Sequence, residues 1–494
     1  MNFYEYQKTL TDKKKKKLGI VYTPESEVSY INQRCLSLWK KDTPPRVIDF
    51  SCGTGVFLHD MGERIAHQYE ISYTEVMDNY ICGVDLDRGA AEVCRTLTGC
   101  PNIVIADGLD VDLASYDIVV GNPPYVRLQN LPLITRQKLE AFEWCHGDTD
   151  LYIAFLQKIM SADCIYGFIC PNSWLHTHAG SHVRDSYLTS RRAVELIDFR
   201  AKQVFKGVGA YCSVVIGDAA PHAQYIFKTD IKDVPSTRSY AKATATNFFL
   251  HPSEVRFMTN MQQKDMGFAE CFDVRVGLAT LADGVYFLPD CVVENAHVFC
   301  PTKNVWVEEA ATRRCYKASK LSLYEGTRED RIIFPYDHNT TVLTEGDFQQ
   351  QYPLAYNYLK QNEPKLIARD KGKFWARCQD GKAMWYEYGR SQALTLGGPK
   401  VLLSTLDKAM RFKRVEEGHL ISGYCVIPKK GYTLSEAEAI LSDPATTTLL
   451  ELKGKPMAGG YHSVSKEFFT HLRFNSKDLN RKEYNDFTIP HVEG

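Results

Sequence analysis

The tetrapeptide Asn122-Pro123-Pro124-Tyr125 is the part of this sequence whose residue types best suit chemistry. It follows an apolar run, residues 117–121, that reads as a short buried strand. Consecutive prolines fix the backbone and leave carbonyl groups without competing donors. The side-chain oxygen of Asn122 and the carbonyl of Pro123 could each accept an N–H from a weakly nucleophilic aromatic amine, which would free the lone pair of its nitrogen for attack. The ring of Tyr125 could hold a planar base in position.

Three acidic residues end three successive apolar runs upstream of the tetrapeptide. Asp49 leads into Gly53 and Gly55, whose small size lets the backbone turn sharply and approach a ligand. Asp85 stands where a ribose diol is bound in nucleotide-binding folds, and Asp107 could accept from an adenine amino group. Together they predict an adenosine pocket at one edge of a sheet. The alternatives are solvated loop acids and a proline turn capped by asparagine.

The elements that must position these residues can be read from the first 220 residues. Short apolar runs alternate there with amphipathic stretches such as residues 151–163, as in a mostly parallel sheet wrapped by helices. The pattern predicts seven strands, at residues 47–50, 80–84, 103–106, 117–121, 167–171, 193–199 and 212–217. The alternation weakens after residue 218. We therefore expect an α/β, doubly wound domain over residues 1–235 and a mixed α+β domain over residues 236–494.

Composition places the chain among ordinary globular proteins. Its 494 residues are 44% hydrophobic and 24% charged, and the mean hydropathy is −0.30. No run of 18 apolar residues is present, and the lysines at positions 13–17 are followed by no apolar stretch, so we expect a cytoplasmic protein without a membrane span or a secretory signal. The 15 cysteines include no C-x-x-C pair, which predicts free, largely buried thiols.

Charge is balanced over the whole chain but not along it. The net charge is −1, yet residues 352–430 hold 15 Lys and Arg against 7 Asp and Glu, a local balance of +8. Aromatic residues at positions 374, 375, 385, 386 and 388 are interleaved with these cations. Such a mixture suits phosphate neutralisation and base stacking, and a solvated face beside a core is the alternative.

Two other groups of residues carry weaker signals. His176, His178 and His182 lack acid or cysteine partners at ligand spacing, so we read them as surface or loop histidines and expect no metal. The five lysines from Lys13 to Lys17 could contact DNA phosphates or form a flexible, solvated terminus.

Residues 19–217 resemble the catalytic domain of γ-class DNA N6-adenine methyltransferases, the TaqI-like family of restriction-modification enzymes. The order of the motifs carries the resemblance: residues 19–24 (GIVYTP) are similar to the family's methionine-binding segment and precede both the glycine loop and Asn-Pro-Pro-Tyr. Residues 167–175 resemble the family's sixth strand and the helix after it, and residues 204–205 resemble a segment whose aromatic ring stacks on the target base. Phe50 and Val56 depart from the common pattern without removing a polar group. Gly108 stands where some members have an aromatic residue, so the wall of the adenine pocket would depend more on Leu86.

The resemblance implies a Rossmann-like seven-stranded methyltransferase sheet that binds S-adenosyl-L-methionine and methylates an adenine flipped out of double-stranded DNA. It implies catalytic roles for Asn122, Pro123, Tyr125 and Phe205, of which Tyr125 and Phe205 would sandwich the base. Burial in the core is the alternative for Phe205. The implied cofactor-binding residues are Tyr22, Thr23, Asp49, Gly53, Gly55, Asp85, Leu86 and Asp107.

The second half resembles the target-recognition domain of the same family. Its landmarks are residues 276–287, 334–336, 385–390 and 459–466. The side chains that read bases differ between specificities and cannot be carried over. From the basic segment we expect DNA contacts from Lys371, Lys373, Arg377, Arg411 and Arg414.

Three other functions compete with this reading. Protein glutamine methyltransferases also use Asn-Pro-Pro-Tyr, but they resemble a catalytic domain without a large basic C-terminal domain. A fused nuclease would need more than the 18 residues that precede residue 19, so we expect cleavage, where it occurs, to come from a separate restriction endonuclease. The intact tetrapeptide and the three acids argue against a non-catalytic DNA-binding module. We expect a monomer.

Overall fold

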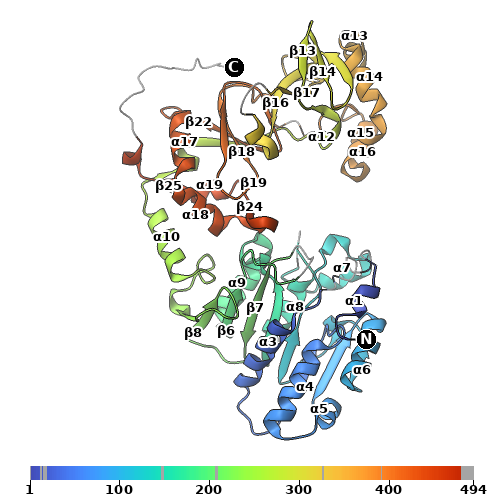
Figure 1. Cartoon of the computed structure of the whole chain (residues 1–494), viewed down its shortest axis with the longest axis vertical. Coiled ribbons are helices and arrows are strands. Elements are labelled where there is room, and N and C mark those ends of the chain that lie inside the picture. Colours follow the sequence, from blue (N-terminus) through green and yellow to red (C-terminus); the bar gives the residue numbers. More distant parts are fainter. Residues whose placement is uncertain are drawn as a thin grey trace. The chain divides into compact units, whose positions relative to one another are not determined.

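The computed structural model describes residues 2–11, 14, 19, 21–145, 149–205, 210–324, 328–390 and 392–479. The chain forms two compact units (Figure 1). Unit 1 comprises Met1–Arg256 with Pro456–Ala458, and unit 2 comprises Phe257–Lys455 with Gly459–Gly494. The division falls inside helix α10 (Pro252–Gln262).

Unit 1 is built on a nine-stranded sheet of order β3-β2-β1-β4-β5-β7-β6-β8-β9. Strands β1 to β5 run parallel, and β7 is antiparallel to both of its neighbours. Because the strand order reverses between β1 and β4, their carboxyl ends form the switch point at which such sheets bind ligands. The strands are β1 (Val47–Asp49), β2 (Ile81–Asp85), β3 (Ile103–Ile105), β4 (Ile118–Gly121), β5 (Ile165–Pro171), β6 (Ala193–Asp198), β7 (Cys212–Gly217), β8 (Gln224–Lys228) and β9 (Ser236–Ser239).

The expected fold class is confirmed, because all seven expected strands form within two residues of their expected bounds. Two further strands extend the sheet: β8 pairs with β6 in parallel, and β9 pairs with β8. Unit 1 therefore continues to Arg256, past the boundary expected at residue 235. Buried Phe248 and Phe249 pack against this extension, since the Tyr225 hydroxyl donates to the carbonyl of Phe248.

Helices cover both faces of the sheet (Figure 1). Helices α3, α4, α5 and α6 contribute to one large apolar core with the strands, and α8 packs on the opposite face, where Phe155 stacks on Phe50 at a centroid distance of 5.0 Å. The helices of unit 1 are α1 (Tyr6–Thr9), α3 (Glu25–Leu38), α4 (Val56–Tyr69), α5 (Tyr73–Asn79), α6 (Arg88–Thr98), α7 (Leu133–Leu139), α8 (Tyr152–Ser161) and α9 (Ser181–Ser190).

Unit 2 is a mixed α+β unit around two apolar clusters. Its main sheets have the orders β11-β22-β18-β20, β12-β17-β16-β21 and β13-β14-β15, and β19 pairs with β24. The strands are β10 (Met266–Gly267), β11 (Phe272–Val276), β12 (Phe287–Leu288), β13 (Val292–Glu294), β14 (His297–Cys300), β15 (Val305–Glu308), β16 (Thr312–Lys317), β17 (Asp330–Ile333), β18 (Lys400–Ser404), β19 (Leu406–Asp407), β20 (Phe412–Val415), β21 (His419–Ile421), β22 (Gly423–Pro428), β24 (Tyr461–Ser463) and β25 (Arg473–Phe474), and β23 (Lys455–Met457) crosses the division between the units.

The helices of unit 2 are mostly short, and α13 to α16 follow one another along the chain (Figure 1). Side chains of α13 to α15 help to form the larger of the two clusters. The helices are α11 (Phe268–Cys271), α12 (Asp283–Tyr286), α13 (Glu345–Gln351), α14 (Pro353–Gln361), α15 (Glu363–Ile367), α16 (Lys373–Gln379), α17 (Leu434–Ser442), α18 (Pro444–Lys453) and α19 (Phe468–His471).

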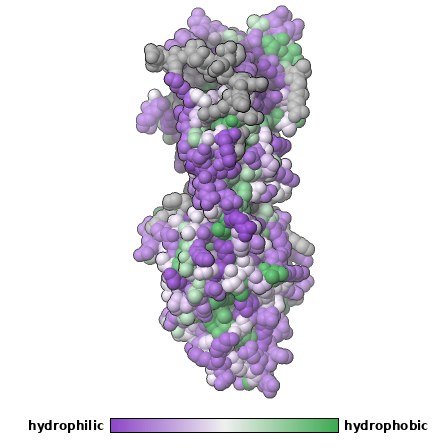
Figure 2. Space-filling view, turned by 90° about the vertical axis from the view of Figure 1, so that its left-hand side faces the viewer, coloured by the Kyte–Doolittle hydropathy of each residue, from purple (hydrophilic) through white to green (hydrophobic). Residues whose placement is uncertain are grey.

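The outside of the molecule is mainly hydrophilic on the face that Figure 2 shows, with hydrophobic residues in small, separate patches. Among the described residues, no helix is long and apolar enough to cross a membrane. The fifteen cysteines all lie in the described residues and none forms a disulfide, as expected, and all except Cys82, Cys291 and Cys378 are buried.

Replacing Gly167 by alanine tests how closely α3 packs on the sheet. The added Cβ would lie 2.3 Å from Cys35 Sγ and 2.7 Å from Ile31 Cγ2. We therefore expect Gly167→Ala to lower the free energy of unfolding by about 1–3 kcal/mol in urea titrations followed by circular dichroism. Gly346→Ala in α13 is the matched control, since its Cβ would meet nothing within 4 Å and should be neutral or stabilising. Equal stability of the two variants would contradict the close packing.

Candidate active site

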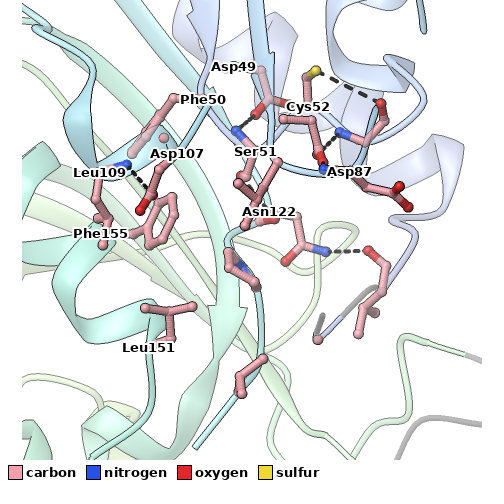
Figure 3. A pocket seen from close by; sticks show the side chains of 18 of the residues that line it. Asp49, Phe50, Ser51, Cys52, Asp87, Asp107, Leu109, Asn122, Leu151 and Phe155 are labelled. Carbon is pink, nitrogen blue, oxygen red and sulfur yellow. Dashed lines mark hydrogen bonds between the residues drawn. The ribbon is translucent and has the colours of Figure 1, made fainter. Parts of the chain in front are cut away.

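A cavity of about 400 Å³ lies at the carboxyl ends of β1 and β2 and beside the turns after β3 and β4 (Figure 3). That size suits a nucleoside-sized ligand. Most of the expected cofactor-binding residues line it, namely Tyr22, Thr23, Asp49, Gly53, Asp85, Leu86 and Asp107, together with Asn122. Leu86 is 66% exposed although it is apolar, so it offers a flat surface to a ring. Gly55 is not part of the lining.

The glycine loop between β1 and α4 forms one wall of the cavity. Gly53 has a positive φ of 53°, and its N–H donates to Asp85 Oδ2 at 2.8 Å. Gly55 is the N-cap of α4 with a φ of 93°, and a Cβ there would lie 2.5 Å from Cys94 Sγ. Gly55 therefore serves the close packing of α4 against α6 rather than direct contact with a ligand.

Of the three acids, Asp49 is buried and Asp85 is partly buried. Asp49 is 1% exposed and accepts from the backbone N–H of Ser51 at 2.9 Å. Burial raises the pKa of Asp49 to about 8, with a smaller contribution from the charge of Asp85. Burial also raises the pKa of Asp85, although this carboxylate accepts from the backbone N–H groups of Gly53 and Asp87. Each of the two carboxylates keeps lone pairs for a ligand.

The third acid, Asp107, is held by groups on both sides. Its Oδ1 accepts from the backbone N–H of Leu109 at 3.0 Å, and Lys138 Nζ lies 2.6 Å from its Oδ2. Lys138 also pairs with Asp110 at 2.6 Å. Since Lys138 belongs to α7, this ion pair joins α7 to the end of β3.

The amide of Asn122 is fixed in one orientation. Its Nδ2 donates to the carbonyl of Val21 at 3.0 Å and to Thr23 Oγ1 at 3.1 Å (Figure 3). A backbone carbonyl only accepts, so the nitrogen must face Val21 and the oxygen must face away. The Oδ1 atom is buried, and no described residue donates to it. A buried amide oxygen without a donor costs free energy, which a ligand N–H at this position would recover.

Two close approaches tie the Asn122 loop to its surroundings. A Cβ on Gly121, whose φ is 149°, would lie 2.6 Å from Asp49 Oδ1, so only a glycine lets the loop pass this carboxylate. A Cβ on Gly19 would lie 2.6 Å from the backbone nitrogen of Tyr125, which donates to the Gly19 carbonyl at 3.2 Å. Gly19 and the tetrapeptide Asn122-Pro123-Pro124-Tyr125 therefore pack closely against each other.

Tyr125 and Phe205 lie together, but their rings do not form an open sandwich. Their centroids are 6.1 Å apart with an interplanar angle of 62°, and Phe205 is 2% exposed within the core of unit 1. A base stacked on both rings would need them parallel and about 7 Å apart, twice the stacking distance. A sandwich at this position therefore requires one of the rings to turn.

The N-terminal residues reach the same site, which the sequence did not reveal. Tyr6 donates to Asp87 Oδ2 at 3.0 Å, and Lys14 lies 3.0 Å from the same oxygen. The hydroxyl of Thr54 donates to the carbonyl of Phe3 at 2.7 Å. The sequence did contain a signal for Asp87, since this acid follows Asp85 by two residues. In the structure Asp87 also caps the start of α6. Lys13 and Lys15–Lys17 lie outside the described residues.

Lys138, the partner of Asp107, was also missed, because nothing in the sequence of α7 marks a ligand-binding residue. The histidines that were read as surface or loop residues include His176, whose Nε2 lies 3.9 Å from Asp198 Oδ2. In the part of the chain that the structure describes, no group of three or more His, Cys, Asp and Glu residues could hold a metal ion.

The five expected DNA-binding cations fall into two sets on unit 2. Lys371 lies two residues before α16 and Lys373 and Arg377 lie within it, whereas Arg411 follows β19 and Arg414 lies in β20. Figure 1 shows α16 well apart from β18 and β19. The cations of the basic segment therefore do not form one patch.

The aromatic residues of the same segment correct an expectation. Phe374, Trp385, Tyr386 and Tyr388 are at most 7% exposed and belong to the core or line it, so these four are not available to stack on bases. The fifth aromatic residue, Trp375, is partly buried and packs against the same core. Arg369 is buried among them and donates to the carbonyls of Thr280, Trp385 and Glu387. The interleaved pattern of cations and aromatic rings therefore arises mainly from the packing of the unit 2 core and not from a base-stacking surface.

The fold and the switch-point cavity define a Rossmann-like α/β class, and comparisons with known proteins place it more narrowly. Residues 101–205 match the model of the Eco57I restriction-modification methylase family. The chain is 21% identical to the type II restriction enzyme and methyltransferase RM.Eco57I of Escherichia coli over 318 residues, which are 57% of this chain and 32% of that protein. The chain thus spans about a third of the length of this relative.

Other relatives match over more of their length. The chain is 24% identical to the type II methyltransferase M.BanIII of Aneurinibacillus aneurinilyticus over 84% of this chain and 82% of that protein. The modification methylase CviBIII of Paramecium bursaria Chlorella virus NC1A is 26% identical over 53% of this chain and 70% of that protein. Among solved structures, the type IIL restriction-modification enzyme MmeI superposes with a TM-score of 0.64 over 93% of this chain and 69% of that chain, at 14% identity. These matches confirm the resemblance to restriction-modification methyltransferases.

Replacing Asp49 by asparagine tests the burial of this carboxyl group. Because its pKa is about 8 in the folded chain and about 3.9 when unfolded, the folded state retains a proton that the unfolded state loses. The cost of burying Asp49 therefore rises with pH between about 4 and 8 and then levels off. Asparagine avoids this cost and can still accept from Ser51.

We expect the stability advantage of Asp49→Asn, without ligand, to grow by a few kcal/mol over this range in urea titrations at several pH values. Asp112→Asn, at an exposed acid on the same unit, should show no comparable trend. An advantage that does not change with pH would mean that Asp49 is not the buried acid described above.

Proposed function

We propose that this chain is a site-specific DNA methyltransferase that transfers a methyl group from S-adenosyl-L-methionine to the N6 amino group of an adenine flipped out of double-stranded DNA. The observation that carries the proposal is the buried Asn122 Oδ1, which has no donor among the described residues and belongs to an amide that cannot turn. The relatives support the broader class, because several are type II methyltransferases. MmeI, whose fold is similar, is described in complex with DNA.

The chemistry of an adenine amine matches this acceptor. The amine carries two N–H groups, and its lone pair is delocalised into the ring. Asn122 Oδ1 would accept one N–H and the Pro123 carbonyl the other, which draws the nitrogen toward tetrahedral geometry and directs its lone pair outward. These hydrogen bonds strengthen as the nitrogen becomes positively charged, so they favour the transition state over the bound substrate. The proton leaves to solvent after the new bond forms.

The donors and acceptors of the cavity fit S-adenosyl-L-methionine, which when bound supplies an electrophilic methyl group. Asp49, beside Gly121, would hold the ammonium of the methionine portion. Asp85 would accept from the ribose hydroxyls through lone pairs that the backbone leaves free, and Leu86 would cover the adenine ring. Asp107, held by Lys138, would accept from the adenine amine. Tyr22 and Thr23 complete the methionine side, where Thr23 also fixes Asn122.

Base flipping would be served by Tyr125 and Phe205 once their rings become parallel, since a flipped base is held by stacking. We further propose that unit 1 includes the catalytic domain and that unit 2 recognises the DNA target. Lys371, just before α16, and Lys373 and Arg377 within it are proposed phosphate contacts. A separate endonuclease, a monomeric state and a cytoplasmic location stay predictions from the sequence.

Replacing Asn122 by alanine tests the catalytic role. Since the Oδ1 hydrogen bond forms mainly in the transition state, we expect Asn122→Ala to slow single-turnover methylation of DNA by about 10²–10³-fold or more, with cofactor and DNA affinities within a few fold of the parent chain. Asn79→Ala, in α5 outside the cavity, is the control and should keep the parent rate. Normal turnover with lost DNA binding would contradict the catalytic role.

Cofactor binding should release a proton from Asp49. Near pH 6.5 this carboxyl group is mostly protonated because its pKa is about 8, and an ammonium ion can pair only with the carboxylate. Calorimetry with S-adenosyl-L-methionine in buffers of different ionisation enthalpy should therefore report the release of nearly one proton at about this pH. Asp49→Asn should bind more weakly and release almost none. Equal proton release by both chains would remove Asp49 from the methionine site.

A further inference from the structure

Arg411 occupies an unusual position in unit 2, at the edge of a recess of about 440 Å³ beside β19. Six of the eleven residues that line this recess carry a hydroxyl group. It is formed by Ala318, Ser319, Leu321, Ser322, Ser404, Thr405, Leu406, Asp407, Arg411, Ser422 and Tyr461. Hydroxyl groups can donate and accept over short distances, as the edges of base pairs require.

Asp407 fixes Arg411 from the buried side. Its carboxylate is buried, and both of its oxygens accept from Arg411 Nε, at 2.8 and 2.9 Å. Asp407 Oδ1 also accepts from the backbone N–H of Lys408 at 2.8 Å, which holds the carboxylate itself in place. The guanidinium is therefore oriented by a rigid partner, although the Arg411 side chain is 58% exposed.

The terminal nitrogens of Arg411 are left for a ligand. Within the described part of the chain, the side-chain hydrogen bonds of Arg411 all run through Nε, so its two terminal NH₂ groups can still form a planar fork of donors. Other arginines of the basic segment differ. Arg414 pairs with Glu416 at 3.2 Å and lies 4.0 Å from Glu438. Arg369 donates its hydrogen bonds to carbonyls of the core.

The wall of the recess beside Ser422 is also rigid. Ser422 adopts a φ of 59°, which a serine rarely occupies, and its hydroxyl donates to Asp283 Oδ2 at 3.2 Å. Asp283 accepts from Thr280 as well, at 2.6 Å. Strained backbone that is held by such bonds is common at ligand-binding sites.

We propose that Arg411 reads a guanine of the DNA target through the O6 and N7 atoms of the base, and that Asp407 is its positioning residue. The proposal rests on the proposed function of unit 2 in DNA recognition. A guanidinium fork bonds these two acceptors in the plane of the base, which distinguishes guanine from the other bases. Because Asp407 neutralises the charge of Arg411, the pair adds little long-range attraction to phosphates. Because a buried carboxylate already orients the Arg411 guanidinium, less entropy is lost when this group binds a base edge.

The test compares the target sequences of matched variants. DNA from cells that express the parent chain, Arg411→Lys, Asp407→Asn or Arg275→Lys is sequenced for modified bases, and the modified motif is derived for each chain. We expect a guanine in the parent motif at which Arg411→Lys accepts other bases, with discrimination reduced roughly 5- to 150-fold, the equivalent of about 1–3 kcal/mol. Asp407→Asn should relax the same position, and Arg275→Lys, at an equally exposed arginine that pairs with Asp273, should keep the parent motif.

The outcomes distinguish a failure of the proposed methyltransferase function from a failure of the inference about Arg411. A parent chain that modifies no DNA in cells and none in vitro would overturn the proposed function and this inference with it. A parent chain that methylates a defined motif, while Arg411→Lys keeps that motif or weakens all sites alike, would overturn only the inference. If Arg411→Lys modifies too few sites to derive a motif, competition binding of the purified variant to duplexes substituted at each motif position gives the same measurement. Undiminished discrimination there would overturn the inference too.

Discussion

The two hydrogen bonds that Asn122 Nδ2 donates to Val21 and Thr23 determine what the site can do. Their acceptors belong to a segment about a hundred residues earlier in the chain. With the nitrogen held in this way, the amide oxygen has no donor among the described residues. Gly19 lets this segment lie against the backbone of Tyr125. The position of the acceptor therefore depends on contacts between two loops, and the sheet supplies only their common support.

Much of the fold followed from the sequence, for a physical reason. Buried parallel strands need continuous apolar runs, and the helices between them need amphipathic stretches, so seven strands of unit 1 could be located from pattern alone. The runs that became β8 and β9 were missed. Lys228 at the end of β8 reads as polar, yet it is 8% exposed because its Nζ donates to the carbonyl of Ile231. Only the folded arrangement shows that such a lysine is buried.

The acids of the site were predictable because parallel strands end at the same edge, which brings Asp49, Asp85 and Asp107 to one cavity. Their partners were not. Lys138 reaches Asp107, and Tyr6 reaches Asp87, across contacts that no local spacing encodes. Composition misled for the same reason in unit 2, where Trp385 and Tyr388 look like a stacking surface in the sequence but form the interior. Residue type alone does not say which side of a helix or loop faces the core.

The free thiols give this chain an internal reporter of its own opening. Burial raises the pKa of thiols such as Cys35 and Cys170 in unit 1 and Cys315 and Cys425 in unit 2, so they stay protonated and poorly reactive while the surrounding core is closed. Alkylation of such a thiol must wait for local unfolding. Because the buried cysteines occur in both units, their rates of labelling would measure how often each unit opens, without any probe being introduced.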